Sequence, residues 1–259
     1  MSFSAEISPD WRAGRGPHGG YLAAMLLRAL TETVAEPARA PRSLTVHYAR
    51  APEPGPVSIH TVIERQGRSL STLSARMERD GSLIALVLGA FSVAWSGGPE
   101  IVEMQMPEVA PADPTREPGT LRSIGAPPFT GQLVFQPRMG AVPFSGAEQP
   151  MEIGGWLGLA EPRPIDALSL AFFSDALFSP PFIRLSERAT SPTIDLTVHF
   201  RTPMPRAPDP DPQELCLAHF RSGLVHEGFF EEDGVIWAAD GTLLAQSRQL
   251  AILMPLTGR

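Results

Sequence analysis

Lysine and asparagine are both absent from this chain of 259 residues, so all 21 basic residues are arginine. Without lysine the chain cannot form a lysine Schiff base, bind pyridoxal phosphate covalently or build a phosphate loop of the lysine type. Without asparagine it has no N-glycosylation site. A lysine-free, arginine-rich composition is typical of a GC-rich bacterial genome, so we expect a bacterial protein.

Cysteine and long apolar runs are also scarce. Cys216 is the single cysteine, which excludes an internal disulfide and a cysteine-rich metal site. The longest apolar run, residues 21–30, is interrupted by Arg28 and is too short to span a bilayer. The opening residues MSFSAEISPDW lack the charge pattern and apolar segment of a signal peptide. We therefore expect a cytoplasmic protein with no membrane partner.

The charge and histidine patterns exclude two further classes of partner. The formal net charge is −7, and no arginine stripe with interleaved aromatic residues is present, so we expect no nucleic-acid partner. The six histidines have no metal-ligand spacing, and we expect no metal. No Gly-x-Ser-x-Gly motif is present. A hydrophobic content of 43% with 19% charged residues indicates a globular core.

A repeated stretch is the most informative feature. LTVHYARAP at residues 44–52 returns as LTVHFRTPMP at residues 196–205. Alternating apolar residues follow each copy and lead to an Asp-Gly pair, at Asp80 and at Asp240, which predicts a hairpin in each half. The spacing between the copies increases along the chain, so we expect a short insertion in the second copy near residues 223–230.

Each copy is preceded by an apolar segment with helical character. Residues 19–37 are apolar nearly all round and predict a buried helix, and residues 164–182 predict a second helix between proline signals. Each half thus has one long buried helix and several antiparallel strands, and the two sheets are expected to pair edge to edge. We predict an α+β fold with an N-terminal unit (1–96), a Pro- and Gly-rich linker (97–130) and a C-terminal unit (131–259).

The two copies differ at polar positions in the strands. Asp195 stands where the first copy has serine, and Gln249 stands where the first copy has small residues. Asp195 could instead cap a turn or pair with an arginine, Gln249 could lie on a solvated strand face, and Ser222 is unremarkable alone. His47 and His199 occur in both copies and are interpreted as structural. The differences predict one asymmetric site.

The first helix opens with His18-Gly19-Gly20, and nothing similar precedes the second. The two glycines could serve only close approach of the helix to the sheet. Alternatively, their amides could form a positive pocket for a carbonyl oxygen or anion. For His18 we favour a capping or core role over catalysis.

The motifs GPHGGYLAAMLLRAL and DGTLLAQSRQLAI resemble the acyl-CoA thioesterase II-like family, and the resemblance covers almost the whole chain. It implies a double-hotdog fold, in which each sheet wraps a central helix, and hydrolysis of acyl-CoA without metal or organic cofactor. It also implies an Asp, Thr or Ser, and Gln catalytic set in the second unit. We predict Asp195, Ser222 and Gln249 for these roles.

We also predict that His18, Gly19 and Gly20 take part in substrate binding. An enoyl-thioester hydratase or dehydratase using an Asp-His pair remains an alternative, with Asp195 and His199 suitably spaced. A non-catalytic acyl-CoA-binding protein is another. Hotdog sheets commonly pair further, so we expect a homodimer or a higher homo-oligomer.

Overall fold

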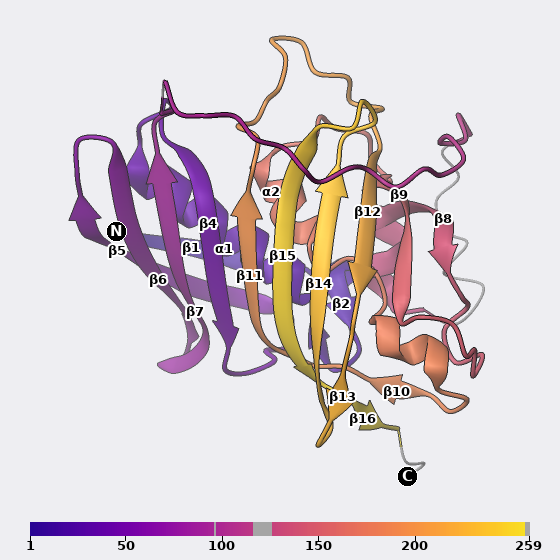
Figure 1. Cartoon of the computed structure of the whole chain (residues 1–259). Helices are drawn as coiled ribbons and strands as arrows, with labels where there is room; N and C mark the ends of the chain where they lie inside the picture. Colours follow the sequence, from indigo (N-terminus) through magenta and orange to yellow (C-terminus); the bar gives the residue numbers. More distant parts are fainter. Residues whose placement is uncertain (96, 116–125, 257–259) are drawn as a thin grey trace.

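The two copies of the repeated stretch lie side by side at the centre of one sheet in the computed structural model, which describes residues 1–95, 97–115 and 126–256 (Figure 1). Strand β4 (Ala40–Tyr48) pairs antiparallel with β11 (Thr193–Phe200), and Thr45 lies opposite Thr197. The hydroxyl oxygens of these two threonines are 3.1 Å apart. The expected edge-to-edge pairing of two halves is therefore confirmed, and the repeated strands themselves form the junction.

The remaining strands extend outward from this junction in matching order. On the first side they are β7 (Ser82–Ser92), β6 (Leu70–Arg79), β5 (Gly55–Gln66) and β1 (Ser2–Ile7). On the second side they are β15 (Leu243–Ile252), β14 (Phe229–Trp237), β12 (Cys216–Arg221), β9 (Glu152–Leu159) and β8 (Leu133–Gly140).

Shorter elements complete the fold. They are η1 (Pro9–Trp11), β2 (Arg12–Ala13) with β3 (Gly16–Pro17), η3 (Pro128–Gln132), η4 (Pro180–Arg184), β10 (Ala189–Thr190) with β16 (Met254–Pro255), and β13 (Val225–His226), which pairs with β14. Strand β13 extends a hairpin in the region where the second copy was expected to carry an insertion.

The predicted hairpins both form. Asp80 and Gly81 connect β6 and β7 with φ angles of 50° and 73°, the left-handed values that an Asp-Gly turn of the primed type requires. Gly241, between β14 and β15, has a φ of 85°. Asp-Gly sequences tolerate these angles, which is why both turns could be predicted.

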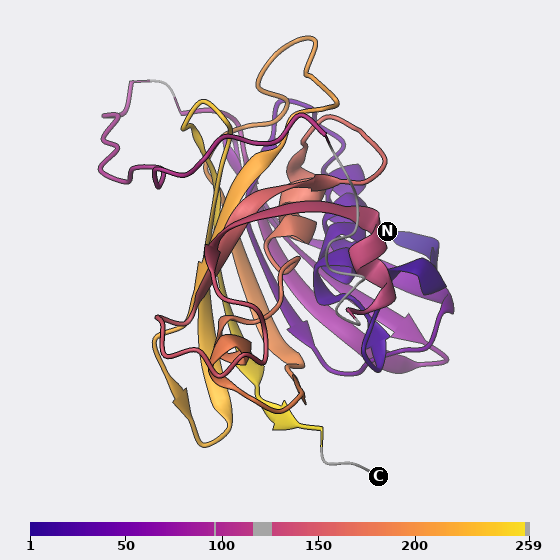
Figure 2. The same cartoon turned by 90° about the vertical axis from the view of Figure 1, so that its right-hand side faces the viewer.

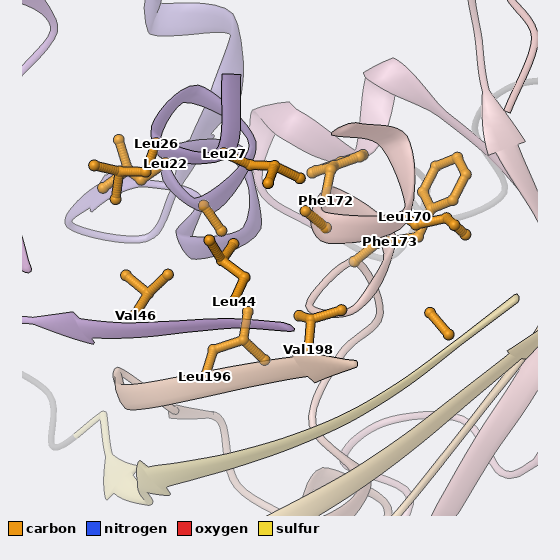
Figure 3. Close-up of a cluster of buried hydrophobic side chains, with 14 of the residues drawn as sticks. Leu22, Leu26, Leu27, Leu44, Val46, Leu170, Phe172, Phe173, Leu196 and Val198 are labelled. Atoms are coloured by element: carbon orange, nitrogen blue, oxygen red, sulfur yellow. The ribbon is translucent and has the colours of Figure 1, made fainter. Parts of the chain in front are cut away.

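Helix α1 (Gly19–Val34) lies against the concave side of the sheet (Figures 1 and 2). Leu22, Leu26 and Leu27 of α1 are buried against strands that include β4, whose Leu44 and Val46 point inward (Figure 3). The helix ends where Ala35 adopts a left-handed φ of 50°. The sequence prediction of a buried first helix is confirmed.

The second helix is much shorter than predicted. Helix α2 (Ala167–Phe173) has seven residues and begins at Asp166, whose carboxylate accepts from the Ser169 amide in a capping box. Its last residue is Phe173 and its C-cap is Ser174, and the predicted stop at Pro180 instead opens the separate helix η4. The prediction of a long helix in each half was therefore wrong for the second half, because the apolar run after Phe173 packs as loop and short helix.

Part of the predicted linker crosses the outer face of the second half, in front of β15, β14 and β12 (Figure 1). Met106 and Val109 pack on a small apolar cluster that includes Trp156 and Leu217. The indole Nε1 of Trp156 donates to the Ala110 carbonyl at 2.9 Å. We call residues 104–113 the strap; residues 116–125 of the predicted linker lie outside the described residues. Among the described residues, neither helix combines the length and the apolarity needed to cross a bilayer.

Candidate active site

The N-terminus of α1 holds a carboxylate from the other half of the chain. Asp175, two residues beyond the end of α2, accepts a hydrogen bond through Oδ2 from the Gly20 amide at 2.8 Å. Amides in the first turn of a helix lack partners inside the helix and carry the positive end of its dipole. The Gly20 amide therefore binds a carboxylate of the chain itself, and the predicted role of Gly19 and Gly20 in substrate binding stays a prediction.

Glycine is required here by space. A Cβ on Gly20 would lie 2.5 Å from the Phe172 carbonyl oxygen, and a Cβ on Gly19 would lie 2.8 Å from Asp175 Oδ2. The Phe172 carbonyl belongs to the backbone and cannot move aside. The Asp175 side chain could move away from a Cβ on Gly19, but it would then leave the Gly20 amide. The two glycines therefore allow α1 and α2 to approach closely enough for Asp175 to reach the helix end.

His18 supports this arrangement from the N-cap position of α1. Its Nε2 lies 2.7 Å from the backbone carbonyl oxygen of Asp175 and 3.6 Å from Oδ2. A carbonyl can only accept, so Nε2 carries the proton. Burial lowers the pKa of His18 despite the neighbouring carboxylate, so the ring is neutral. Its Nδ1 is buried and has no hydrogen-bond partner among the described residues.

Tyr48, at the end of β4, also contacts the helix terminus. Its hydroxyl donates to the Gly19 carbonyl at 2.9 Å. Burial and the negative charge of Asp175 together raise the pKa of Tyr48 well above its usual value. The phenol therefore remains protonated and acts as a neutral donor.

A row of polar side chains lies on the inner face of the second half. The Thr193 hydroxyl donates to Gln249 Oε1 at 2.8 Å, and Gln249 Nε2 donates to Glu232 Oε1 at 2.6 Å. Gln249 and Glu232 are each 4% exposed and lie directly opposite each other on β15 and β14. Buried polar groups need partners, and this chain of hydrogen bonds supplies them.

Glu232 links this row to Asp175 electrostatically. Burial, followed by the charges of Asp175 and Asp233, raises the pKa of Glu232 to about 8, although the hydrogen bond from Gln249 opposes the shift. Asp175 must therefore lie close enough for its charge to act on Glu232. The charge of Asp175 thus connects the helix terminus, which residues from both halves of the chain form, with the polar row.

The predicted catalytic residues are not all brought together. Asp195 pairs with His47 on one side and with Leu250 on the other, and both of these partners are exposed. Gln249 pairs instead with the buried Leu196 and so faces the opposite side of the sheet. The register therefore places Asp195 on the outer face, away from the polar row. His199 is also exposed on that face.

Ser222 directly follows β12 and is buried. Its neighbour Arg221 pairs with Asp233, so the same register continued by one residue brings Ser222 opposite Glu232. The hydroxyl donates only a long 3.4 Å bond to the Leu224 carbonyl. Ser222 thus adjoins the row that contains Gln249, while Asp195 does not.

Sequence reasoning missed Asp175, Thr193, Glu232 and Tyr48. Asp175 is a charged residue inside the apolar run LSLAFFSDALF, which was the one available signal. Thr193 is only two residues from Asp195, but the strand bulge between these two residues changes the face that each presents. Among the described residues, no group of three or more His, Cys, Asp or Glu side chains could hold a metal ion.

Comparisons with known proteins agree with this architecture. A model of the acyl-CoA thioesterase N-terminal domain matches residues 7–93, and a model of the acyl-CoA thioesterase C-terminal domain matches residues 106–253. An uncharacterized Mycobacterium tuberculosis protein, Rv0499, is 24% identical over 97% of this chain and 90% of its own length.

Solved structures share the fold. A hot dog fold protein of unknown function from Alicyclobacillus acidocaldarius has a TM-score of 0.80 at 24% identity, with 97% of this chain and 92% of that chain covered. Acyl-CoA thioesterase II TesB2 from Mycobacterium marinum has a TM-score of 0.69 at 20% identity, with 94% and 92% covered. The predicted double-hotdog fold is confirmed. Because the two domain models together span most of its length, the chain belongs to the acyl-CoA thioesterase family and is a thioester hydrolase.

Proposed function

We propose that this enzyme hydrolyses acyl-CoA to the free acid and CoA at the site between Gly20, Asp175 and Gln249. The observation that carries the proposal is the 2.8 Å hydrogen bond from the Gly20 amide to Asp175 Oδ2. It holds a carboxylate, with its side chain only 11% exposed, at the positive end of a helix. A fixed, nearly buried carboxylate next to neutral donors and acceptors suits a general base.

In the proposed mechanism Asp175 accepts a proton from a water molecule as the water oxygen attacks the thioester carbonyl carbon. Thr193 and Gln249 hold that water, since a hydroxyl and an amide can orient it without adding charge. The positive end of α1 stabilises the negative charge that develops on the carbonyl oxygen. The carbon–sulfur bond then breaks, and the CoA sulfur leaves with the proton from Asp175.

This proposal moves the base from Asp195 to Asp175 and retains Gln249. Ser222 remains a candidate water ligand beside Glu232, and His18, Gly19 and Gly20 remain candidate substrate contacts. His18 is the proposed support of the Asp175 backbone through its 2.7 Å contact.

The test is thiol release from a panel of acyl-CoAs by two matched variants, Asp175→Asn and Asp195→Asn. Loss of a general base lowers kcat by about 10²- to 10⁴-fold, and we expect that loss for Asp175→Asn only. The Asp195→Asn variant, altered on the outer face, should retain nearly full turnover. The reverse result would return the base to Asp195.

The hydratase alternative requires an Asp-His pair, and the Asp195 and His199 candidates both lie on the outer face. His18 and Asp175 form an Asp-His pair at the helix terminus, but the Nε2 proton of His18 is already donated to the backbone carbonyl of Asp175. Water addition to an enoyl thioester without thiol release would support the hydratase. If the unaltered protein binds acyl-CoA but does not turn it over, the non-catalytic binding protein would be supported.

The homo-oligomer and the domain limits stay predictions.

A further inference from the structure

Glu232 is a buried carboxyl group for which the proposed mechanism has no role. It lies on β14 with 4% of its surface exposed, in a row whose other members are neutral. Its Oε1 accepts from Gln249 Nε2 at 2.6 Å, and Gln249 Oε1 accepts from Thr193 at 2.8 Å. Burying a carboxyl is costly, and a glutamine could pack as well if only its space were needed.

The hydrogen-bond chain has a defined direction. Because Glu232 Oε1 accepts, the amide of Gln249 must turn its nitrogen toward β14 and its oxygen toward Thr193. The Thr193 hydroxyl then donates to that amide oxygen, which leaves the hydroxyl oxygen free to accept from another group. Without an acceptor at position 232, the amide could rotate and reverse the roles of both groups.

We propose that Glu232 is a positioning residue that fixes the orientation of the Gln249 amide and, through it, of the Thr193 hydroxyl. This inference rests on the proposed hydrolysis at the Asp175 site. Glu232 does not contact the reacting atoms in the proposed mechanism. It acts through Gln249, which holds the water.

The charges around Glu232 define how pH should affect this role. Among the residues that the structure describes, Asp175 is the one carboxylate from outside β14 that acts on Glu232. The neighbours on the inner face, Gln249, Thr193 and Ser222, are neutral. Asp233, on the same strand, faces the other side and binds Arg248. His18 and Tyr48 contact the Asp175 end of the site and are uncharged at neutral pH.

Ionised Glu232 would add a second negative charge beside Asp175. That charge would oppose the negative charge that develops on the thioester oxygen during attack. Turnover should therefore fall as pH rises past about 8, the value to which burial raises the pKa of Glu232.

The experiment compares Glu232→Gln, Glu232→Leu and the control Glu231→Gln, whose carboxylate binds the Gly223 amide at 2.7 Å. We expect Glu232→Leu to lower kcat about tenfold or more with little change in KM. Glu232→Gln keeps an acceptor and should retain most of kcat at pH 7. Its turnover should no longer fall as pH rises past about 8. Glu231→Gln should behave as wild type in both respects.

A double-variant cycle with Gln249→Leu supplies the second readout. Once Gln249 is gone, we expect Glu232→Leu to cause no further loss of kcat, because the two residues act in series. Independent, multiplying losses, or an alkaline fall that persists in Glu232→Gln, would overturn the inference.

Asp175→Asn is assayed in the same series to separate the two proposals. If Asp175→Asn is inactive while Glu232→Leu turns over normally, only the role of Glu232 fails. If Asp175→Asn remains active, the proposed hydrolytic site fails, and with it the role assigned to Glu232.

Discussion

Asp175 accepts a hydrogen bond from the amide of Gly20 although 155 residues separate them. Each residue belongs to a different copy of the duplicated unit, Gly20 to α1 and Asp175 to the segment after α2. The second copy has no His-Gly-Gly sequence before its helix, so the corresponding contact cannot be repeated there. The duplicated scaffold therefore forms one such contact rather than two.

Replacement of Gly20 by alanine should lower turnover by about 100-fold or more. The new Cβ would lie 2.5 Å from the Phe172 carbonyl oxygen, so α1 and α2 would have to separate and Asp175 would lose its amide donor. A misplacement of about 1 Å at a reacting group can cost about 100-fold in rate. Thiol release measures the effect, and Gly98→Ala, a site with open space around it, is the matched control. Full activity in Gly20→Ala would contradict the close-approach argument.

Replacement of Gln249 by leucine should reduce both activity and stability. Thr193 would lose its acceptor and Glu232 its donor, and each unpaired buried polar group costs about 1–3 kcal/mol. We expect kcat to fall. We also expect the free energy of unfolding to drop by about 1–3 kcal/mol for each of the two groups that lose a partner. Thiol release and urea denaturation measure the two effects. Arg248→Leu, altered on the adjacent outward-facing residue, should leave kcat nearly unchanged.

The stability of the protein should depend on pH through Glu232. Burial raises the pKa of the folded-state carboxyl from about 4.5 to about 8, so between these values the folded state keeps a proton that the unfolded state has lost. The contribution of Glu232 is fully present below the unfolded pKa and is lost as pH rises toward 8. Each unit of pH in this window costs roughly 1.4 kcal/mol at most.

Glu232→Gln removes this titration. The free energy of unfolding of the variant should therefore vary less between pH 5 and pH 8 than that of wild type, and the variant should be the more stable protein at pH 8. Denaturant titrations at several pH values measure the difference. Parallel pH curves for the two proteins would show that Glu232 does not titrate as stated.

The strap should loosen when Arg138 is replaced by methionine. Arg138 donates to the Ala110 carbonyl at 3.0 Å and to the Pro111 carbonyl at 2.7 Å. Methionine keeps much of the apolar stem but no donor. Hydrogen exchange over residues 104–113 should become faster, with thiol release unchanged because the strap lies on the outer face. Arg163→Met, in an exposed pair with Asp166, should leave exchange of the strap unaltered.

The sequence by itself determined the duplication, the Asp-Gly hairpins and the first helix, and it singled out Gly19, Gly20 and Gln249 as candidates. These features are encoded locally, in the turn preferences of Asp-Gly, in apolar periodicity and in the contrast between the two copies. The family resemblance followed from the same stretches. It did not identify Asp175, the carboxylate that accepts from the Gly20 amide.

Only the tertiary structure showed which aspartate lies at the N-terminus of α1. Asp195 has the more conspicuous position beside the repeated motif, but a bulge before it and the two-residue period of the strand turn it to the outer face. Asp175 lies two residues after α2, in a segment that the sequence analysis predicted to be helical. Its carboxylate meets Gly20 only because two glycines let the helices from both halves approach. Such a contact depends on packing between distant segments, which local sequence patterns do not specify.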